Sequence, residues 1–312
     1  MRVALIGENS EERKRLEASY LADPKTQIIF SGAAEDLKKV VRTSNVELVE
    51  VFAPVEQRAD LCGICLDAGV NVSVAMPPAT DPEKIEVLKR QAEQRSKFVR
   101  VRNYCLYYEP YQKAGELIAE EKIGWATMLR LVVKHKQIPG KDFNRGQWLL
   151  ENESGYLSLA EYLYGPVEKI FMLAGKSQSN PGSILVGLKF KTPHRMGYML
   201  IDFVPELQIR SFGEPVFRQI WATGTAGVIM VNRGEGQLWR APVLWLRAKD
   251  YSRTWEMLKD DWNLVYPTLV EETFSAVRKN QPVVSGLELA KTGLSLAIAA
   301  GKSLGEAKEM AV

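Results

Sequence analysis

The residues best suited to bind a nucleotide lie in the turn from Gly7 to Glu12. A strand, a glycine-rich turn and a helix together bind pyrophosphate, because the turn lets the phosphates approach the backbone at the helix N-terminus. Of the three glycines expected in such a turn, only Gly7 is present, and Asn9 and Glu12 stand at the other two positions. Glu8 and Glu11 add two further carboxylates, so we expect a turn that repels phosphate.

The end of the second predicted strand normally distinguishes NAD from NADP. An acidic residue there accepts hydrogen bonds from the adenosine ribose of NAD. Here the chain has Ser31 and no carboxylate before Glu35. A serine would tolerate the 2′-phosphate of NADP, but the usual basic partner for that phosphate is also missing, so the choice of nucleotide stays open.

Groups that could transfer a proton lie in two stretches near the middle of the chain. Residues 133–141 contain three lysines and His135, one of two histidines, and Arg145 and Trp148 follow. This favours a site for an anionic ligand with His135 as the proton-transfer group. The same composition is more typical of a solvated strand end, since alternating side chains cannot all face one way.

The second stretch offers Tyr156 and Glu161 as candidate catalytic residues. A phenol or a carboxyl group can serve as a general acid, although packing is the commoner role of a tyrosine.

Two of the three cysteines, Cys62 and Cys65, form a C-x-x-C sequence. They could be a redox pair or half of a zinc site, but neither histidine lies nearby to complete a tetrahedron. Residues three apart share one face of a helix, so two thiols packed inward explain the spacing equally well. We expect no metal site.

Alternating apolar runs and amphipathic stretches predict strand–helix units in the first part of the chain. Strands are predicted at 2–7, 26–31, 46–53, 70–74 and 97–102, and helices at 10–21, 35–43, 57–68 and 81–94. Ser10 is a suitable N-cap for the first helix. This pattern predicts a Rossmann-like α/β domain with a parallel sheet, which we assign to residues 1–122.

The remaining residues, 123–312, predict an α+β domain that follows a helix at 110–121. Strands are predicted at 126–136, 168–174, 183–191, 197–203, 207–212, 216–223 and 227–232, and terminal helices at 255–280 and 287–302. Consecutive strands without intervening helices favour a mostly antiparallel, open-faced sheet.

Composition excludes several classes of protein. The 312 residues carry 41 basic and 38 acidic side chains, a net charge of +3, which disfavours a nucleic-acid partner. No apolar run approaches the ~20 residues needed to span a bilayer, and the first residues lack the features of a signal peptide. Three cysteines cannot form a disulfide framework, so we expect a cytoplasmic protein without a membrane partner.

Landmarks along nearly the whole chain resemble those of one enzyme family. They are Pro54-Val55-Glu56-Gln57-Arg58 followed by Ala68-Gly69, then Ala75-Met76-Pro77-Pro78-Ala79, Ala119 to Gly124, Trp148 followed by Ser154-Gly155, Gly224-Thr225-Ala226-Gly227 and Ser285-Gly286-Leu287-Glu288. In this order they resemble the glucose-fructose oxidoreductase, inositol dehydrogenase and MocA family, written Gfo/Idh/MocA.

The resemblance implies an NAD(P)-binding Rossmann domain and a C-terminal sheet that forms the substrate floor and often a dimer interface. It also implies hydride transfer at a sugar or cyclitol hydroxyl. The positions that it assigns to the cofactor are Gly7, Asn9, Ser10, Ser31, Pro54, Met76 and Pro77.

The catalytic landmarks of the family are altered in this chain. The family's Glu-Lys-Pro motif aligns with Ala75-Met76-Pro77, so a thioether replaces the lysine that polarises the reacting hydroxyl. The family's later Asp and His are both missing from residues 154–165, where Glu161 is the remaining carboxyl.

Two main hypotheses follow. The first is a pseudoenzyme that binds a sugar-like or anionic small molecule, as a homodimer or as the partner subunit of an active paralogue. The second is an active NAD(P)-dependent oxidoreductase that uses His135, Tyr156 or Glu161 for the proton. Lyase or isomerase chemistry on a sugar acid is a third, weaker alternative.

Overall fold

The computed structural model describes residues 1–136, 143–175, 182–205, 216–233, 243–248, 251–255, 258, 264–279 and 283–312. The chain forms two compact units. The first comprises Met1–Tyr107 together with Asn263–Leu294, and the second comprises Tyr108–Trp262 with Ser295–Val312. The sequence prediction placed a single domain boundary after residue 122. It did not assign Asn263–Leu294 to the first unit.

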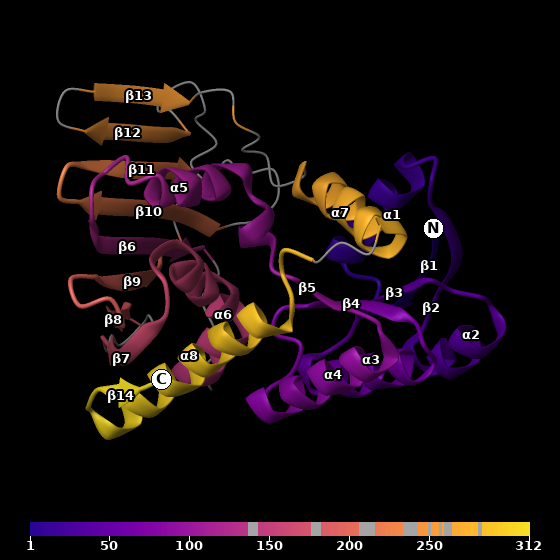
Figure 1. The fold of residues 1–312 in the computed structure, drawn as a ribbon. Coiled ribbons are helices and arrows are strands. Elements are labelled where there is room, and N and C mark those ends of the chain that lie inside the picture. Colours follow the sequence, from indigo (N-terminus) through magenta and orange to yellow (C-terminus); the bar gives the residue numbers. More distant parts are fainter. Residues whose placement is uncertain are drawn as a thin grey trace. The chain divides into compact units, whose positions relative to one another are not determined.

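The first unit is built on a five-stranded parallel sheet with the strand order β2-β1-β3-β4-β5. Its strands are β1 (Arg2–Gly7), β2 (Gln27–Gly32), β3 (Leu48–Phe52), β4 (Asn71–Ala75) and β5 (Val99–Arg102). Its helices are α1 (Glu11–Ala22), α2 (Leu37–Thr43), α3 (Val55–Asp67), α4 (Pro82–Arg95) and α7 (Val265–Lys279), with the 3₁₀ turns η1 (Ala34–Asp36) and η2 (Tyr104–Tyr107). Helices α2, α3 and α4 cover one face of the sheet, and α1 and α7 cover the other (Figure 1).

The strand order makes a binding edge in this unit. After β1 the chain crosses to β2 on one side, and β3 then continues on the other side. The carboxyl ends of parallel strands at such a reversal leave a crevice in which α/β proteins bind their ligands. Ser10 caps α1 at this edge by accepting a hydrogen bond from the backbone N–H of Arg13, as predicted.

The second unit is built on a mostly antiparallel sheet of nine described strands in the order β13-β12-β11-β10-β6-β9-β8-β7-β14. The strands are β6 (Ala126–His135), β7 (Val167–Ala174), β8 (Ile184–Phe190), β9 (Met196–Phe203), β10 (Val216–Gly224), β11 (Gly227–Arg233), β12 (Leu244–Ala248), β13 (Tyr251–Trp255) and β14 (Met310–Ala311). Only the β6–β9 pair is parallel within the part of the sheet that the structure describes. Helices α5 (Glu109–Ala119) and α6 (Arg145–Tyr164) belong to this unit, while α8 (Leu287–Glu306) begins in the first unit and ends in the second.

One face of the second sheet is buried and the other is open. Along β6 the side chains of Leu129, Leu131 and Val133 are buried, whereas the residues between them are partly exposed. Strands β8 and β9 alternate in the same way. Because successive side chains point to opposite faces, this alternation confirms the predicted open-faced sheet.

The sequence prediction was incomplete in the second unit. It assigned no helix to Arg145–Tyr164, which forms α6, and it began the next helix at residue 255, which is the last residue of β13, whereas α7 begins at Val265. Strands β12 and β13 were not predicted, and the strand predicted at 207–212 lies outside the described residues. No helix in the described part of the chain combines the length and apolarity needed to cross a membrane.

Candidate functional site

The structure brings the seven predicted cofactor positions to the carboxyl edge of the parallel sheet. Gly7, Asn9 and Ser10 follow β1, Ser31 lies near the end of β2, Pro54 follows β3, and Met76 and Pro77 follow β4. This edge is where the fold places a ligand, so the prediction of which residues gather there follows from the strand order.

Gly7 makes the sharp turn that this edge requires. Its φ is +113°, and a Cβ at this position would lie 1.8 Å from the carbonyl oxygen of Phe52. The neighbouring Glu8 donates its backbone N–H to the same oxygen at 2.7 Å. Only glycine fits here, which retains the first requirement of a nucleotide-binding turn.

Arg13 supplies the basic group that sequence reasoning did not find near Ser31. Its guanidinium donates to Ser31 Oγ at 2.7 Å, to the carbonyl oxygen of Gly32 at 3.3 Å, and also to the carbonyl oxygen of Gly7. The residue lies in the first turn of α1, and its side chain joins the ends of β1 and β2. A positive charge therefore stands at the strand end where NADP-binding domains accommodate a 2′-phosphate.

A second arginine joins the next two strand ends. Arg58 donates from Nε to the carbonyl oxygen of Ala53 at 2.9 Å and from Nη1 to that of Pro77 at 2.8 Å. Burial, together with the nearby charge of Arg102, lowers the pKa of Arg58 below its ordinary value. Met76 is partly exposed beside this bridge and brings no titratable group to the edge.

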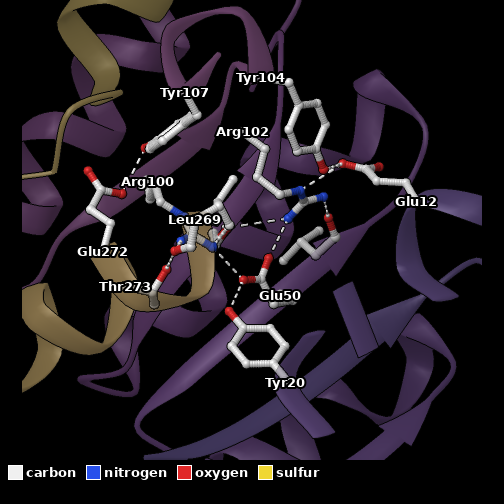
Figure 2. Close-up of polar contacts among 12 residues, drawn as sticks. Glu12, Tyr20, Glu50, Arg100, Arg102, Tyr104, Tyr107, Leu269, Glu272 and Thr273 are labelled. Carbon is white, nitrogen blue, oxygen red and sulfur yellow. Dashed lines mark hydrogen bonds and ion pairs between the residues drawn. The ribbon is translucent and has the colours of Figure 1, made fainter. Parts of the chain in front are cut away.

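Glu12, at the third glycine position, is directed into a buried ion pair (Figure 2). Its Oε1 accepts a hydrogen bond from Arg102 Nε at 2.8 Å and another from the Tyr104 hydroxyl at 2.5 Å. Burial and the charge of Glu12 raise the pKa of Tyr104 well above its ordinary value, so the phenol stays a donor. The carboxylate of Glu12 is thus neutralised by an arginine whose side chain has no exposed surface.

Behind this pair, Figure 2 shows Glu50 between two arginines in the interior of the first unit. Its two carboxylate oxygens accept hydrogen bonds from Arg100 Nη2 and Arg102 Nη1, each at 2.6 Å, and all three side chains are fully buried. Tyr20 on α1 donates its hydroxyl to the carboxylate at 2.5 Å. Arg100 also donates to the carbonyl oxygen of Leu269, which connects the cluster to α7.

Strand register explains how these charges meet. Across the sheet, Glu50 of β3 pairs with Ser73 of β4, and Ser73 pairs with Arg100 of β5. Residues in register point to the same face, so the three side chains form a polar row beneath α1 and α7. Ser73 Oγ accepts a hydrogen bond from Arg100 Nη2 at 2.8 Å.

These contacts change the charge that we expect for the turn from Gly7 to Glu12, which we call the nucleotide turn. Glu12 is paired with Arg102, Glu11 is paired with Lys14 at 2.6 Å, and Arg13 lies beside Gly7. Two of the turn's three carboxylates therefore have a cationic partner, and Arg13 adds a positive charge beside Gly7, so the repulsion of phosphate that the sequence alone suggests is reduced.

In the second unit the structure gives His135 a buried carboxylate partner. His135 Nε2 lies 2.8 Å from Glu153 Oε1, which joins the end of β6 to α6. The Glu153 side chain has no exposed surface, and its second oxygen, Oε2, has no hydrogen-bond partner among the described residues. A carboxylate in such a place can hold an imidazole in one tautomer and one orientation.

The walls around this pair are aromatic on one side and cationic on the other. The His135 ring lies 4.9 Å from the Trp148 ring and 6.0 Å from the Phe203 ring, measured between centroids. Arg218 Nη2 lies 3.8 Å from Glu153 Oε1, and its guanidinium lies over the Tyr156 ring at 5.8 Å. His135, Glu153, Arg218 and Tyr156 therefore form one cluster, which we call the His135 cluster.

The other predicted catalytic groups have different surroundings. Tyr156 is buried and donates its hydroxyl to the carbonyl oxygen of Gln219 at 3.3 Å. Glu161 accepts a hydrogen bond from the backbone N–H of Val167 at 2.7 Å, eight residues beyond Glu153 on α6. At ~1.5 Å per residue this distance along the helix is about 12 Å, so the structure does not bring Glu161 to His135.

Successive side chains of β6 point to opposite faces, so Lys134 and His135 of the 133–141 stretch do not face the same way. His135 points to the buried face of β6 with Leu131 and Val133, while Lys134 pairs in register with Phe217 and lies over its ring at 5.4 Å. Lys141 lies outside the described residues. His135 is thus not part of a solvated strand end, which was the more typical explanation of the sequence.

The C-x-x-C cysteines lie on α3, and both thiols are buried and free. Burial raises the pKa of Cys62 to about 12 and that of Cys65 well above its ordinary value. Within the described residues no group of three or more His, Cys, Asp or Glu side chains is arranged to hold a metal ion. The geometry agrees with the alternative of two thiols packed inward.

The chain matches no family model and no curated protein sequence. Solved structures are similar over the whole chain. A myo-inositol dehydrogenase from Corynebacterium glutamicum is 13% identical with a TM-score of 0.79, covering 100% of this chain and 98% of that one. An oxidoreductase from Agrobacterium radiobacter, in complex with NAD+, L-tartaric acid and magnesium, is 12% identical with a TM-score of 0.81 and the same coverage.

A third similar structure is GenD2 from gentamicin A biosynthesis, in complex with NAD. It is 15% identical with a TM-score of 0.79, covering 100% of this chain and 96% of that one. Together with the parallel five-stranded sheet and the open antiparallel sheet, these likenesses show that the chain has the fold of the Gfo/Idh/MocA-type oxidoreductases.

Proposed function

We propose that this chain is an NAD(P)-dependent oxidoreductase of the Gfo/Idh/MocA type in which His135, oriented by Glu153, transfers the proton of a sugar-like or cyclitol-like hydroxyl. The observation that carries the proposal is the buried pair between His135 Nε2 and Glu153 Oε1 at 2.8 Å. Neither the lysine nor the histidine of the family motif is present, and this pair supplies a general base in their place.

The carboxyl edge of the first unit fits a dinucleotide. Gly7 permits close approach to the backbone, and the capped N-terminus of α1 follows it directly. Arg13 and Ser31 lie where the adenosine ribose would be held. The carboxylate of Glu12 is paired with Arg102. When bound, NAD(P) supplies the acceptor or donor of the hydride. Two similar structures are complexes with NAD+ or NAD, which supports the same cofactor class here.

The chemistry of the His135 cluster follows from the hydrogen bond to Glu153. With Nε2–H donating to the carboxylate, the lone pair of the imidazole lies on Nδ1, which then accepts the hydroxyl proton. The charge of Arg218 compensates the buried carboxylate when the imidazole is neutral.

Nucleotide titration tests this function. NADH and NADPH should each be added to the purified chain and the thermal midpoint followed. A ligand at 100 times its Kd stabilises the folded state by about 2.7 kcal/mol, so we expect an upward shift of several degrees for at least one of them. Absence of any shift at millimolar concentration of both nucleotides would overturn the proposal.

A second candidate function is a non-catalytic binding role, as a partner subunit of an active paralogue. Met76 favours it, because a thioether at the position of the family lysine cannot polarise a hydroxyl. Under this function the chain binds a sugar-like or anionic small molecule without turnover. Co-purification with an active paralogue, combined with no response to nucleotide, would support it over the first.

We further propose a homodimer and a cytoplasmic location. The open face of the nine-stranded sheet leaves side chains such as Leu173 and Met196 about half exposed, and such surface favours association. Sedimentation velocity tests the dimer, and cell fractionation tests the location.

A further inference from the structure

A pocket of about 370 Å³ lies within the second unit between α5 and the strands β12 and β13. Pockets of ~300–1,000 Å³ typically hold small molecules. One wall comes from α5 and its C-cap, where Lys113, Leu117 and Glu120 follow each other at helical spacing and so share a face. Lys122, just beyond the helix, continues this wall.

The opposite wall comes from the edge strand of the sheet. Tyr251, Arg253 and Trp255 alternate along β13 and therefore point to the same face. Arg253 pairs in register with Leu246 of β12, whose buried side chain forms the apolar floor. The Arg253 guanidinium lies 4.7 Å from the centroid of the Trp255 ring, a stacked cation–π geometry.

Lys113, Lys122 and Arg253 line the pocket together with one carboxylate, that of Glu120. Lys113 Nζ is paired at 2.6 Å with the carboxylate of Glu116, a neighbour on α5. Lys122 lies 3.6 Å from Glu120, and both side chains are about half exposed, so this pair opens at little cost. Within the described chain no carboxylate lies at ion-pair distance from Arg253, whose positive charge is therefore available to a ligand.

From these walls we infer a second binding site, for a small planar aromatic anion. The ring of such a ligand would stack on Arg253, Tyr251 and Trp255, and its carboxylate or phosphate would meet Lys113 and Lys122. The site goes beyond the proposed oxidoreductase function and does not depend on it, since all its residues differ from those of the nucleotide edge and the His135 cluster.

Calorimetric titration of the full chain with 1-naphthoate and 1-naphthyl phosphate tests the site and distinguishes the two anionic groups. We expect at least one to bind with 1:1 stoichiometry. Two probes separate ring from charge: 2-naphthol has the ring without the anion at neutral pH, and acetate has the anion without the ring. Each should bind at least tenfold more weakly than the better naphthyl anion.

Arg253→Ala should weaken binding about tenfold, and Arg253→Lys should weaken it less, because lysine keeps the charge but not the planar stack. The matched control is Arg247→Ala, on β12 but on the opposite face from Leu246, which should leave affinity unchanged. Equal thermal midpoints of the two alanine variants exclude misfolding as the cause.

The inference would be overturned by no binding of either naphthyl anion, by equal binding of 2-naphthol, or by equal losses of affinity in Arg253→Ala and Arg247→Ala. It would also be overturned by a change of oligomeric state in Arg253→Ala with naphthoate binding retained. That outcome would assign the wall of β13 to contact with a second copy of the chain. None of these results bears on nucleotide binding.

Discussion

Glu12, at the start of α1, accepts a hydrogen bond from Nε of Arg102, at the end of β5, at 2.8 Å. The two residues are 90 positions apart in the chain. The contact draws a carboxylate out of the nucleotide turn and gives it a buried positive partner. It is the clearest point at which the structure revises what the glycine-poor turn suggests.

Replacing Glu12 by glycine should have opposite effects on binding and on stability. Glycine restores the third small residue of the turn, so affinity for NADH or NADPH should rise about tenfold. Loss of a charged hydrogen-bond partner of Arg102 should lower the free energy of unfolding by about 1.5–3 kcal/mol. Glu11→Gly is the matched control, since it places the same glycine in the same turn but removes only an exposed partner of Lys14. Equal stability of the two variants would contradict the structural role of Glu12.

Glu50→Gln should be far more destabilising than loss of a surface carboxylate. The change leaves the buried guanidinium groups of Arg100 and Arg102 without their shared counter-charge, a loss of about 3–5 kcal/mol. Glu86→Gln, which breaks the solvent-exposed pair with Lys291, should be far less destabilising. Urea denaturation measures both. A difference of less than 1 kcal/mol between them would show that the cluster does not stabilise the first unit.

The same cluster predicts a pH dependence of stability. Burial alone would raise the pKa of Glu50, but the charges of Arg100 and Arg102 and hydrogen bonds from Tyr20 and Ser73 bring it below its ordinary value. A lowered folded-state pKa means that this contribution is complete above the unfolded value, ~4.3, and is lost as the pH falls through the folded value. The gap in unfolding free energy between wild type and Glu50→Gln should therefore narrow below about pH 4. A constant gap from pH 7 to pH 3 would refute this assignment.

The buried thiols should be inert in the folded protein. Burial raises the pKa of Cys62 to about 12, so almost none of its thiolate is present at pH 8, and Cys65 is shifted in the same direction. Ellman's reagent at pH 8 should label neither residue before unfolding, and all three free cysteines in 8 M urea. Rapid labelling of Cys62 under native conditions would revive the redox-pair hypothesis.

The His135 cluster should control turnover rather than nucleotide binding. His135→Asn removes the proton-transfer group, and general bases contribute typically ~10²–10⁴ in rate, so kcat should fall by that factor. Glu153→Gln keeps the shape but loses the charge and should give a smaller loss. Glu151→Gln, on the same helix and bonded to Gln147, is the control that should retain wild-type kcat. A wild-type kcat in His135→Asn would remove His135 from the mechanism.

The parallel sheet could be predicted from the sequence because β1 to β4 are short, rich in apolar residues and separated by amphipathic helical stretches. Helix α6 could not be predicted as easily, since its polar and apolar residues do not follow a clear helical stripe. Strand β13 was missed because Tyr251–Trp255 is polar, as suits an exposed edge, and lacks the apolar alternation of the inner strands.

The buried charges carried a signal that periodicity could have identified. Arg100 and Arg102 alternate with valines in β5, which places both guanidinium groups on one face, and Glu50 is the lone charge in an apolar strand. Glu153 lies three residues before Tyr156 and four before Leu157, on the buried side of α6. What the sequence could not supply is the pairing, because partners 50 or 90 residues away are set by strand order.

The hydrogen bond from Arg100 to the carbonyl oxygen of Leu269 joins positions 169 residues apart. During synthesis the ribosome completes the five strands of the first unit long before α7 emerges, and strands β6 to β13 of the second sheet are translated in between. At ~5–20 residues per second, Leu269 is synthesised on the order of ten seconds or more after Arg100, which has no access to this acceptor until then. The N-terminal unit therefore cannot finish folding in the order in which it is made, and a fragment that ends after Tyr107 should expose the sheet face that α7 covers.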